Sequence, residues 1–148
     1  MKYVSSIASI TCLLIAVACS KPVPNPPEAQ PITQTVAFRV AQAKSYDAPV
    51  YNGLMAEVKL TISKENIHTG VNTIVWDSTI AMQRIQLFPQ AVSPALIVKN
   101  IGNVIPDRQQ LRTSVVIRYV TSQNNTYHKA VGTAMPHYTN FQQVEVTL

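Results

Sequence analysis

Side chains that could carry acid–base or metal chemistry are few in this sequence and widely spaced. Its three histidines, His68, His128 and His137, form no HxH or HExxH pattern, and no cysteine follows Cys19 to complete a zinc site. Seven carboxylates are scattered along the chain, and no pair has a spacing that indicates a general acid and base. The sequence also lacks a GxSxG nucleophile elbow and a glycine-rich phosphate loop. We therefore expect a protein that is not an enzyme and that needs no metal and no cofactor.

The N-terminal segment has the features of an export signal. Lys2 is followed by an uncharged, largely apolar run from Val4 to Ala18. This run is shorter than the roughly 20 apolar residues that a membrane-spanning helix needs, so it is typical of a cleavable signal peptide. Cys12 lies inside the run and would be removed with it. No cysteine follows Cys19, so the chain beyond Cys19 contains no disulfide.

The cleavage site Ala16-Val17-Ala18-Cys19 resembles the lipobox of bacterial lipoproteins. In that family a signal peptidase cuts just before the cysteine, and the cysteine thiol receives a diacylglycerol. The resemblance implies cleavage between Ala18 and Cys19, lipid attachment at Cys19 and a membrane partner in the bacterial cell envelope. Ala16 departs from the pattern, in which leucine is usual, and the same residues also fit the small-x-small site of ordinary secretion.

The residues after the cysteine bear on which membrane and which face the protein occupies. Ser20 follows the cysteine, and in the lipoproteins of enteric bacteria that this site resembles, a residue other than aspartate at this position directs the protein to the outer membrane. Residues 20–23 contain no acidic side chain, unlike the stretch that marks surface-exported lipoproteins of Bacteroidetes. The resemblance therefore implies an outer-membrane protein that faces the periplasm, with exposure on the cell surface as the alternative.

A proline-rich tether separates the lipidated cysteine from the folded part. Five of the ten prolines fall between Pro22 and Pro31. Because proline lacks the N–H that helices and sheets need, we expect polyproline II or coil, extending about 3.1 Å per residue or roughly 40 Å in total. The predicted organisation is a signal peptide at 1–18, a lipidated cysteine and tether at 19–34, and one domain at 35–148.

The domain has the period-two hydrophobic pattern of half-buried strands. Residues 54–62, 111–119 and 144–148 alternate between apolar and polar side chains. Asn124-Asn125 tolerates the positive φ of a tight turn and predicts a hairpin with its second arm at 127–133. Weaker strand patterns cover 36–43, 73–76, 80–87 and 96–99, with Asp77-Ser78 as a turn signal between two of them. Residues 78–88 also fit an amphipathic helix, although a strand is the favoured interpretation.

These strands predict an all-β fold. Short strands at this spacing are typical of an antiparallel immunoglobulin-like β-sandwich of about 7–9 strands. A transthyretin-like sandwich or a small β-barrel is the alternative.

Two groups of residues are candidates for binding. Tyr46, Tyr51 and Tyr138 lie in predicted loops, and loops on a rigid sandwich often carry binding. A second group consists of cations on the polar faces of strands, which would form a basic face if their strands were neighbours: Arg39, Lys59, Arg112 and Arg118. With a net charge of +5, such a face could meet anionic lipid, lipopolysaccharide or acidic glycans. The absence of an aromatic RNA-binding motif argues against nucleic acid.

We expect the function to be non-catalytic binding by a lipid-anchored envelope protein, with a protein or glycan as its partner. One alternative is an inhibitor or immunity-type lipoprotein that blocks an incoming enzyme through a protruding loop, for which residues 44–53 or 134–140 are candidates. The other alternative is an adhesin or fimbrial subunit, which would require a missing or donated strand.

Overall fold

The structure is a computed structural model that describes residues 29–148. The predicted signal peptide, the cleavage and lipid-attachment residues Ala18 and Cys19, and most of the tether lie outside the described residues. The described chain contains seven strands and two short 3-10 turns: β1 (Ile32–Ala41), η1 (Pro49–Tyr51), β2 (Met55–Asn66), β3 (Asn72–Arg84), η2 (Ile85–Leu87), β4 (Ala95–Val104), β5 (Gln109–Val120), β6 (Thr126–Ala134) and β7 (Phe141–Thr147).

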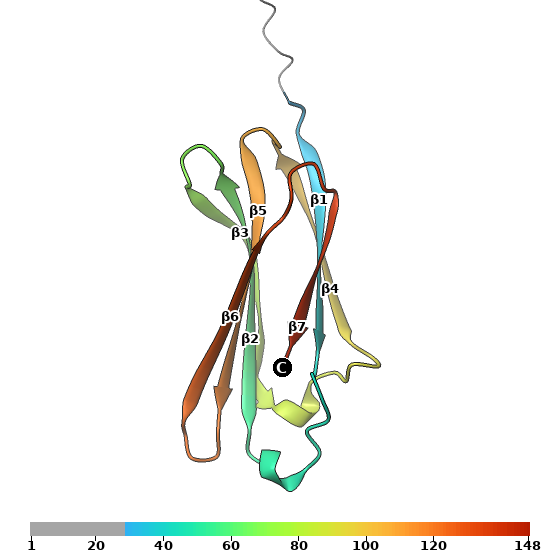
Figure 1. Cartoon of the computed structure of the whole chain (residues 1–148), viewed down its shortest axis with the longest axis vertical. Helices are drawn as coiled ribbons and strands as arrows, with labels where there is room; N and C mark the ends of the chain where they lie inside the picture. Colours follow the sequence, from blue (N-terminus) through green and yellow to red (C-terminus); the bar gives the residue numbers. More distant parts are fainter. Residues whose placement is uncertain (1–28) are drawn as a thin grey trace, which may run out of the picture.

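The strands form two sheets that face each other as a sandwich (Figure 1). One sheet has three strands in the order β4-β1-β7, and the other has four in the order β3-β2-β5-β6. Every ladder is antiparallel except the one between β1 and β7, which is parallel. The expected all-β sandwich is therefore confirmed, and the small barrel is excluded because no ladder joins the two sheets in the described chain.

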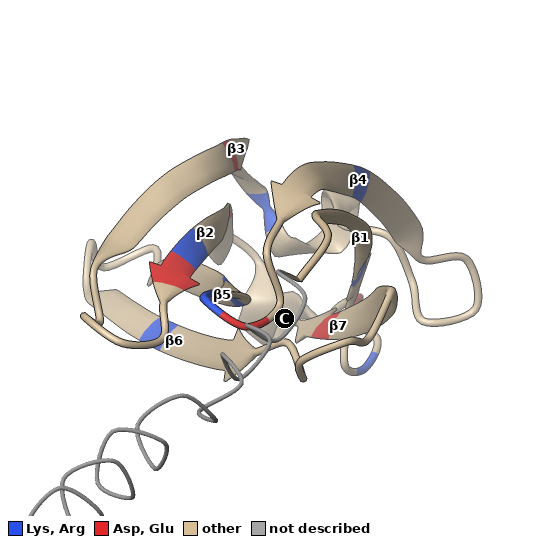
Figure 2. Cartoon of the chain, turned by 90° about the horizontal axis from the view of Figure 1, so that it is seen from above, with Lys and Arg blue, Asp and Glu red and all other residues tan. Residues whose placement is uncertain are grey.

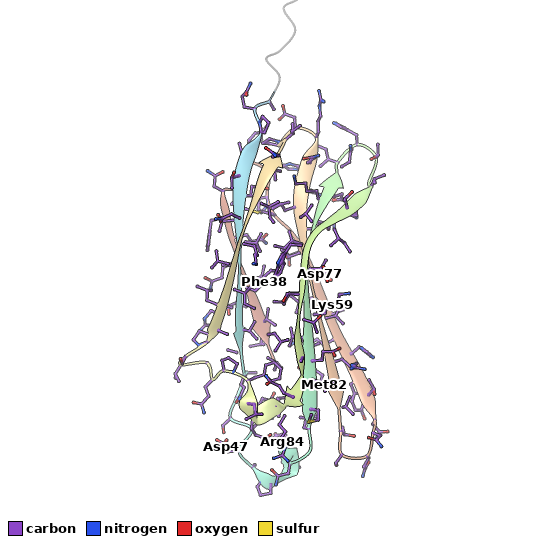
Figure 3. All side chains as sticks on the ribbon, turned by 180° about the vertical axis from the view of Figure 1, so that it is seen from behind. Phe38, Asp47, Lys59, Asp77, Met82 and Arg84 are labelled. Atoms are coloured by element: carbon purple, nitrogen blue, oxygen red, sulfur yellow. The ribbon has the colours of Figure 1, made fainter. Side chains whose placement is uncertain are left out.

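Alternation along the central strands places one side chain in two inside the sandwich. Val36, Phe38 and Val40 of β1 are fully buried, and they face the equally buried apolar side chains of β2 and β5. The Phe38 ring stacks on Trp76 of β3, with ring centroids 5.8 Å apart. Phe38 lies at mid-height between the sheets (Figure 3). The core is therefore built from the segments whose alternation was clearest in the sequence.

The segment around Asp77-Ser78 differs from the expectation. These two residues lie in the middle of β3 and not in a turn, so the two weak strands predicted on either side form a single strand. The reason is tertiary, because β3 pairs with β2 over nearly its full length and local turn preference yields to that ladder. The helix alternative for residues 78–88 is also wrong, since β3 continues to Arg84 and is followed by η2.

The first strand begins inside the predicted tether. β1 starts at Ile32, which pairs with Val104, and the Gln34 side chain is buried with its Nε2 donating to the carbonyl of Thr139 at 2.7 Å. Pro31 can directly precede a strand because the residue before the first ladder bond needs no N–H. The folded domain thus includes residues that composition assigned to the spacer.

Three lysines point into the sandwich and connect the two sheets. Lys64 of β2 donates to the carbonyls of Gly102 and Asn103, both at 2.9 Å. Lys99 of β4 lies 5.3 Å from the centre of the Trp76 ring. Lys129 of β6 donates to the Thr147 carbonyl of β7 at 3.0 Å. Each ammonium therefore spans from its own sheet to the facing one.

Candidate binding surface

One end of the sandwich carries most of the loop residues selected as candidates. β1 begins at the opposite end, so these loops lie as far from Ile32 as the domain allows (Figure 1). We call this the distal end. It comprises residues 42–54, residues 85–94, the β5–β6 hairpin at 121–125, and Leu148.

A cluster of aromatic rings and one lysine shapes the first distal loop. Tyr46 is buried and meets Tyr51 edge to face, with ring centroids 4.9 Å apart. Lys44 Nζ donates to the Tyr51 hydroxyl at 2.6 Å and lies 4.8 Å from the centre of that ring. Tyr119 of β5 packs against the same core. We call Lys44, Tyr46, Tyr51 and Tyr119 the tyrosine cluster.

Burial and mutual proximity change the acidity of these groups. The hydrogen bond to Tyr51 raises the pKa of Lys44 above its ordinary value. Burial raises the pKa of Tyr46, against the smaller opposing effect of the Lys44 charge. Burial also raises the pKa of Tyr119, and the nearby Tyr46 adds to that rise. The raised pKa values keep the Tyr46 and Tyr119 phenols neutral and Lys44 charged at neutral pH, a combination suited to hydrogen bonding and ring contacts.

Gln42 fixes the second distal loop against the end of β1. Its side chain is buried, and Nε2 donates to the carbonyls of Ile85, Gln86 and Phe88 at 3.1, 3.2 and 2.7 Å. Its backbone N–H donates to the Pro89 carbonyl at 2.8 Å. Gln86 Nε2 in turn donates to the Tyr51 carbonyl at 3.2 Å. The two loops are thereby held together by side-chain amides and not by a sheet ladder.

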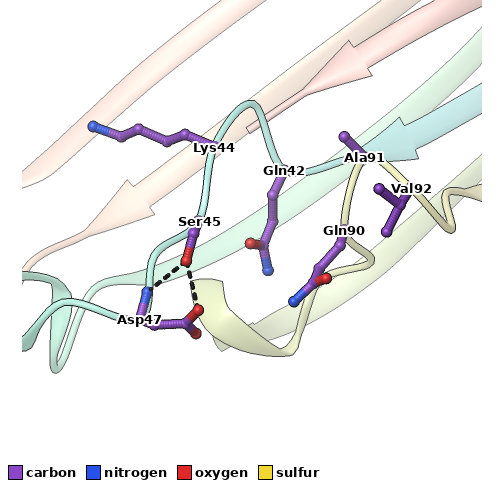
Figure 4. A pocket seen from close by; sticks show the side chains of 7 residues that line it. All are labelled: Gln42, Lys44, Ser45, Asp47, Gln90, Ala91 and Val92. Atoms are coloured by element: carbon purple, nitrogen blue, oxygen red, sulfur yellow. Dashed lines mark hydrogen bonds between the residues drawn. The ribbon is translucent and has the colours of Figure 1, made fainter.

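A hollow of about 330 Å³ opens beside Gln42. Gln42, Gln90 and Asp47 turn toward it, whereas Lys44 points away (Figure 4). The Asp47 carboxylate accepts a hydrogen bond from Ser45 at 2.5 Å, which orients it in the loop. The Gln90 carboxamide and the Asp47 carboxylate can donate and accept hydrogen bonds there, beside the apolar Ala91 and Val92.

A second hollow of about 480 Å³ shares Asp47 with the first. Arg84, at the end of β3, lines it together with Asn52 and Gln86. Asp47 and Arg84 both lie at the distal end (Figure 3). A carboxylate and a guanidinium with amides between them can recognise polar groups of either charge.

The distal loops also expose aliphatic side chains. Val50 in η1 is 81% exposed, Leu87 in η2 is 67% exposed and Val92 is 89% exposed. Single exposed apolar residues are ordinary, but here Val92 lines the first hollow, Leu87 lines the second, and Val50 lies at the same end of the molecule. The distal end thus combines apolar, amide and charged groups, as protein-binding surfaces do.

Three of the four predicted basic-face residues lie on two neighbouring strands, and the fourth lies on the other sheet. Arg39 lies on the three-stranded sheet, whereas Lys59, Arg112 and Arg118 lie on the four-stranded sheet. Basic and acidic positions are interspersed on both sheets (Figure 2). Each arginine pairs with a carboxylate on a neighbouring strand: Arg39 with Glu145 at 2.9 Å, Arg112 with Glu65 at 2.5 Å, and Arg118 with Glu57 at 3.2 Å. The expected cationic surface is therefore largely neutralised locally.

The three candidate tyrosines occupy different environments. Tyr46 is a core residue, so its side chain is not the exposed aromatic that its loop position suggested. Tyr51 is half-buried in the tyrosine cluster. Tyr138 is exposed at the other end of the sandwich, where its hydroxyl donates to Asp107 and this hydrogen bond raises its pKa. The structure therefore brings Tyr46 and Tyr51 together and leaves Tyr138 apart.

Sequence reasoning missed several residues of the distal end. Gln42 follows β1 with no pattern that signals a buried amide, and Tyr119 was one more apolar position in a strand. Val50 lies between Pro49 and Asn52-Gly53, which are turn-forming residues. An isolated aliphatic side chain in such a turn is expected to be exposed. Leu87 falls at the end of the predicted strand 80–87, and Val92 lies outside every predicted element.

Among residues 29–148, no three histidine, cysteine, aspartate or glutamate side chains gather as a metal site would require. No helix in this part of the chain is long and apolar enough to cross a membrane. Comparison with family models, with curated proteins and with solved structures gives no significant match.

Proposed function

We propose that this protein is a lipid-anchored component of a bacterial cell envelope and that its sandwich domain binds a protein partner without catalysing a reaction. In this proposal Cys19 carries the lipid, and residues 20–31 hold the domain away from the membrane. The outer membrane, with the domain in the periplasm, is the proposed location. The distal end is the binding surface.

The observation that carries the proposal is the composition of the distal end. Val50, Leu87 and Val92 are exposed there, next to hollows lined by amides, Asp47 and Arg84. The loops are anchored by buried Tyr46 and Gln42, so the surface is largely formed before a partner arrives. Pre-formed loops lose less entropy on binding than mobile ones. A tethered domain would also present this end outward.

Photo-cross-linking in intact cells tests the proposed surface. Val50 and Val92 are each replaced by a photoreactive amino acid, and Val98 provides the matched control. Val98 is also an exposed valine, but it lies on the outer face of β4, away from the distal loops. We expect a discrete cross-linked protein from Val50 and Val92 and none from Val98. Equal products from all three positions, or none from the distal pair, would contradict the proposal.

The anchor is tested separately by the intact mass of the protein purified from membranes. We expect a mass increase at Cys19 that corresponds to acyl chains, and its loss in a Cys19→Ser variant. An unmodified protein cut at the same site would remove the lipid anchor from the proposal but leave the binding surface to the cross-linking result.

A second candidate function is inhibition of an incoming enzyme. The loop of residues 44–53 favours it, because Pro49 and the buried Tyr46 hold Val50 outward on a rigid 3-10 turn. Rigid loops of this kind can enter a foreign active site. Under this function the protein cross-linked to Val50 would be a hydrolase from outside the cell, and a Val50→Asp variant would lose protection against it.

A further inference from the structure

The two sheets of the sandwich differ by one strand, and the difference falls at the β6–β7 side. The sheet β3-β2-β5-β6 has four strands, whereas β4-β1-β7 has three. Every residue of β6 is exposed. Its inward-facing side chains, identified by their pairing with the inward-facing residues of β5, include Tyr127 at 59% and Val131 at 47% exposure. Nothing in the described chain covers the inner face of β6.

The inner face of β6 carries the apolar Tyr127 and Val131 beside the inward Lys129, next to a strand that belongs to the core. Val131 is paired with Val115 and Lys129 with Ile117, and both β5 residues are almost fully buried. Burial therefore ends within a single strand width. On the other side of the sandwich, the inward residues of β3 remain half-buried.

The neighbouring edge of β7 has free backbone groups. Leu148 N–H donates to Ala41 and the Leu148 carbonyl accepts from Ala43, so residues of this parity point their backbone toward β1. Backbone groups alternate in direction along a strand. The N–H and C=O groups of Phe141, Gln143, Glu145 and Thr147 therefore point to the open edge. Lys129 already donates a hydrogen bond to one of these groups, the Thr147 carbonyl.

From these features we infer that the open edge of β7 accepts an extended segment of a partner polypeptide as a fourth strand, which covers the inner face of β6. The unpaired backbone groups select an extended strand. The exposed Tyr127 and Val131 select apolar side chains at alternate positions. Lys129 has no ion pair with any carboxylate of residues 29–148, so an acidic side chain on the same face of the partner complements it. This site is separate from the distal end and does not rest on the proposed function.

Binding of a model peptide to the purified protein tests the inference. The probe is the blocked peptide TVTETVTVT, which has valines and one glutamate on one face, and the charge control is TVTKTVTVT. Amide hydrogen exchange of the protein is followed residue by residue. We expect new protection at Gln143 and Glu145 with the first peptide, because these N–H groups become ladder donors. Protection at the outer edge of β6, at His128 or Ala130, would place the strand on the wrong sheet and overturn the inference.

A proline substitution isolates the backbone contribution. Gln143→Pro removes an N–H that points to the open edge and leaves the ladder with β1 intact, as proline is tolerated on edge strands. Gln143→Ala is the matched control, since it removes the same side chain but keeps the N–H. We expect the proline variant to bind the peptide about tenfold more weakly than the alanine variant. Equal binding by the two folded variants would overturn the inference.

Charge reversal tests the role of Lys129. In a Lys129→Glu variant we expect the preference to change from the glutamate peptide to the lysine peptide. No binding of either peptide by the unsubstituted protein up to about 1 mM would overturn the inference. Protection of Gln143 that depends on protein concentration alone would identify a second copy as the occupant and would also overturn it.

Discussion

Gln42 connects the end of β1 to η2. Replacing it should destabilise the domain by more than the lost packing of one side chain. Gln42→Ala removes one amide that faces three carbonyls, and Gln42→Glu keeps the shape but replaces the donor with an acceptor. The side chain is 4% exposed, so water cannot easily substitute for it. The two variants therefore separate the loss of volume from the loss of the hydrogen-bond donor.

The magnitude follows from the number of N–H groups. An amide has two hydrogens, so at most two of the three contacts are full hydrogen bonds, each with a net contribution of about 0.5–1.5 kcal/mol. We expect Gln42→Ala to lower the free energy of unfolding by about 2–3 kcal/mol, or about 8–12 °C in Tm for a domain of this size. Gln42→Glu should cost at least about 1 kcal/mol more at pH 7, because a buried carboxylate would face carbonyl oxygens.

Urea unfolding at two pH values is the assay. The introduced carboxyl would have a pKa raised in the folded state, so the folded protein binds a proton more readily than the unfolded one. The extra cost of Gln42→Glu should therefore be present at pH 7 and shrink toward pH 4. Equal stability of Gln42→Glu and the unsubstituted protein at pH 7 would refute the view that Gln42 acts as a donor to buried carbonyls.

Three further predictions concern stability. The hydrogen bond from Arg112 lowers the pKa of Glu65. The ionised Glu65 therefore stabilises the fold above the ordinary carboxyl pKa, and this stabilisation is lost as the pH falls. Glu65→Gln should reduce the decline in the free energy of unfolding from pH 7 to pH 3, measured by denaturant unfolding. Gly53 has a φ of +84° and a Cβ there would lie 3.0 Å from Ser122 Cβ, so Gly53→Ala should cost about 1–3 kcal/mol, and unchanged stability would contradict the strain. Phe38→Ala, in the centre of the core, should cost about 3–5 kcal/mol in calorimetry.

The alternation of apolar and polar residues was sufficient to predict the central strands. Ala56, Val58, Leu60 and Ile62 are buried as their spacing indicated, because a strand buried on one face must alternate. The edge strand β3 was less clear, since its register with β2 shifts twice and a shift interrupts the period. Its polar pair Asp77-Ser78 then looked like a turn.

The candidate site was predictable only in part, because burial of loop residues depends on long-range contacts. Tyr46 lies in a loop by sequence, yet it packs against strands far away along the chain and meets Tyr51. The predicted basic face is divided between the two sheets and paired with carboxylates for a related reason. The parity of Arg39, Arg112 and Arg118 in their strands was read correctly, but the carboxylates that pair with them come from neighbouring strands whose order only the fold defines.

The parallel ladder between β1 and β7 has a consequence for how the chain folds. It pairs Thr35 with Phe141, so the central strand of one sheet has only β4 beside it until β7 has emerged from the ribosome. Such distant pairing makes folding slow and leaves the chain unfolded while it is still being synthesised. Under the proposed location in the cell envelope this delay would be useful, because a translocation channel that threads extended polypeptide would receive the chain before the sandwich closes. The topology would thus order two events in time, passage across the membrane first and folding second.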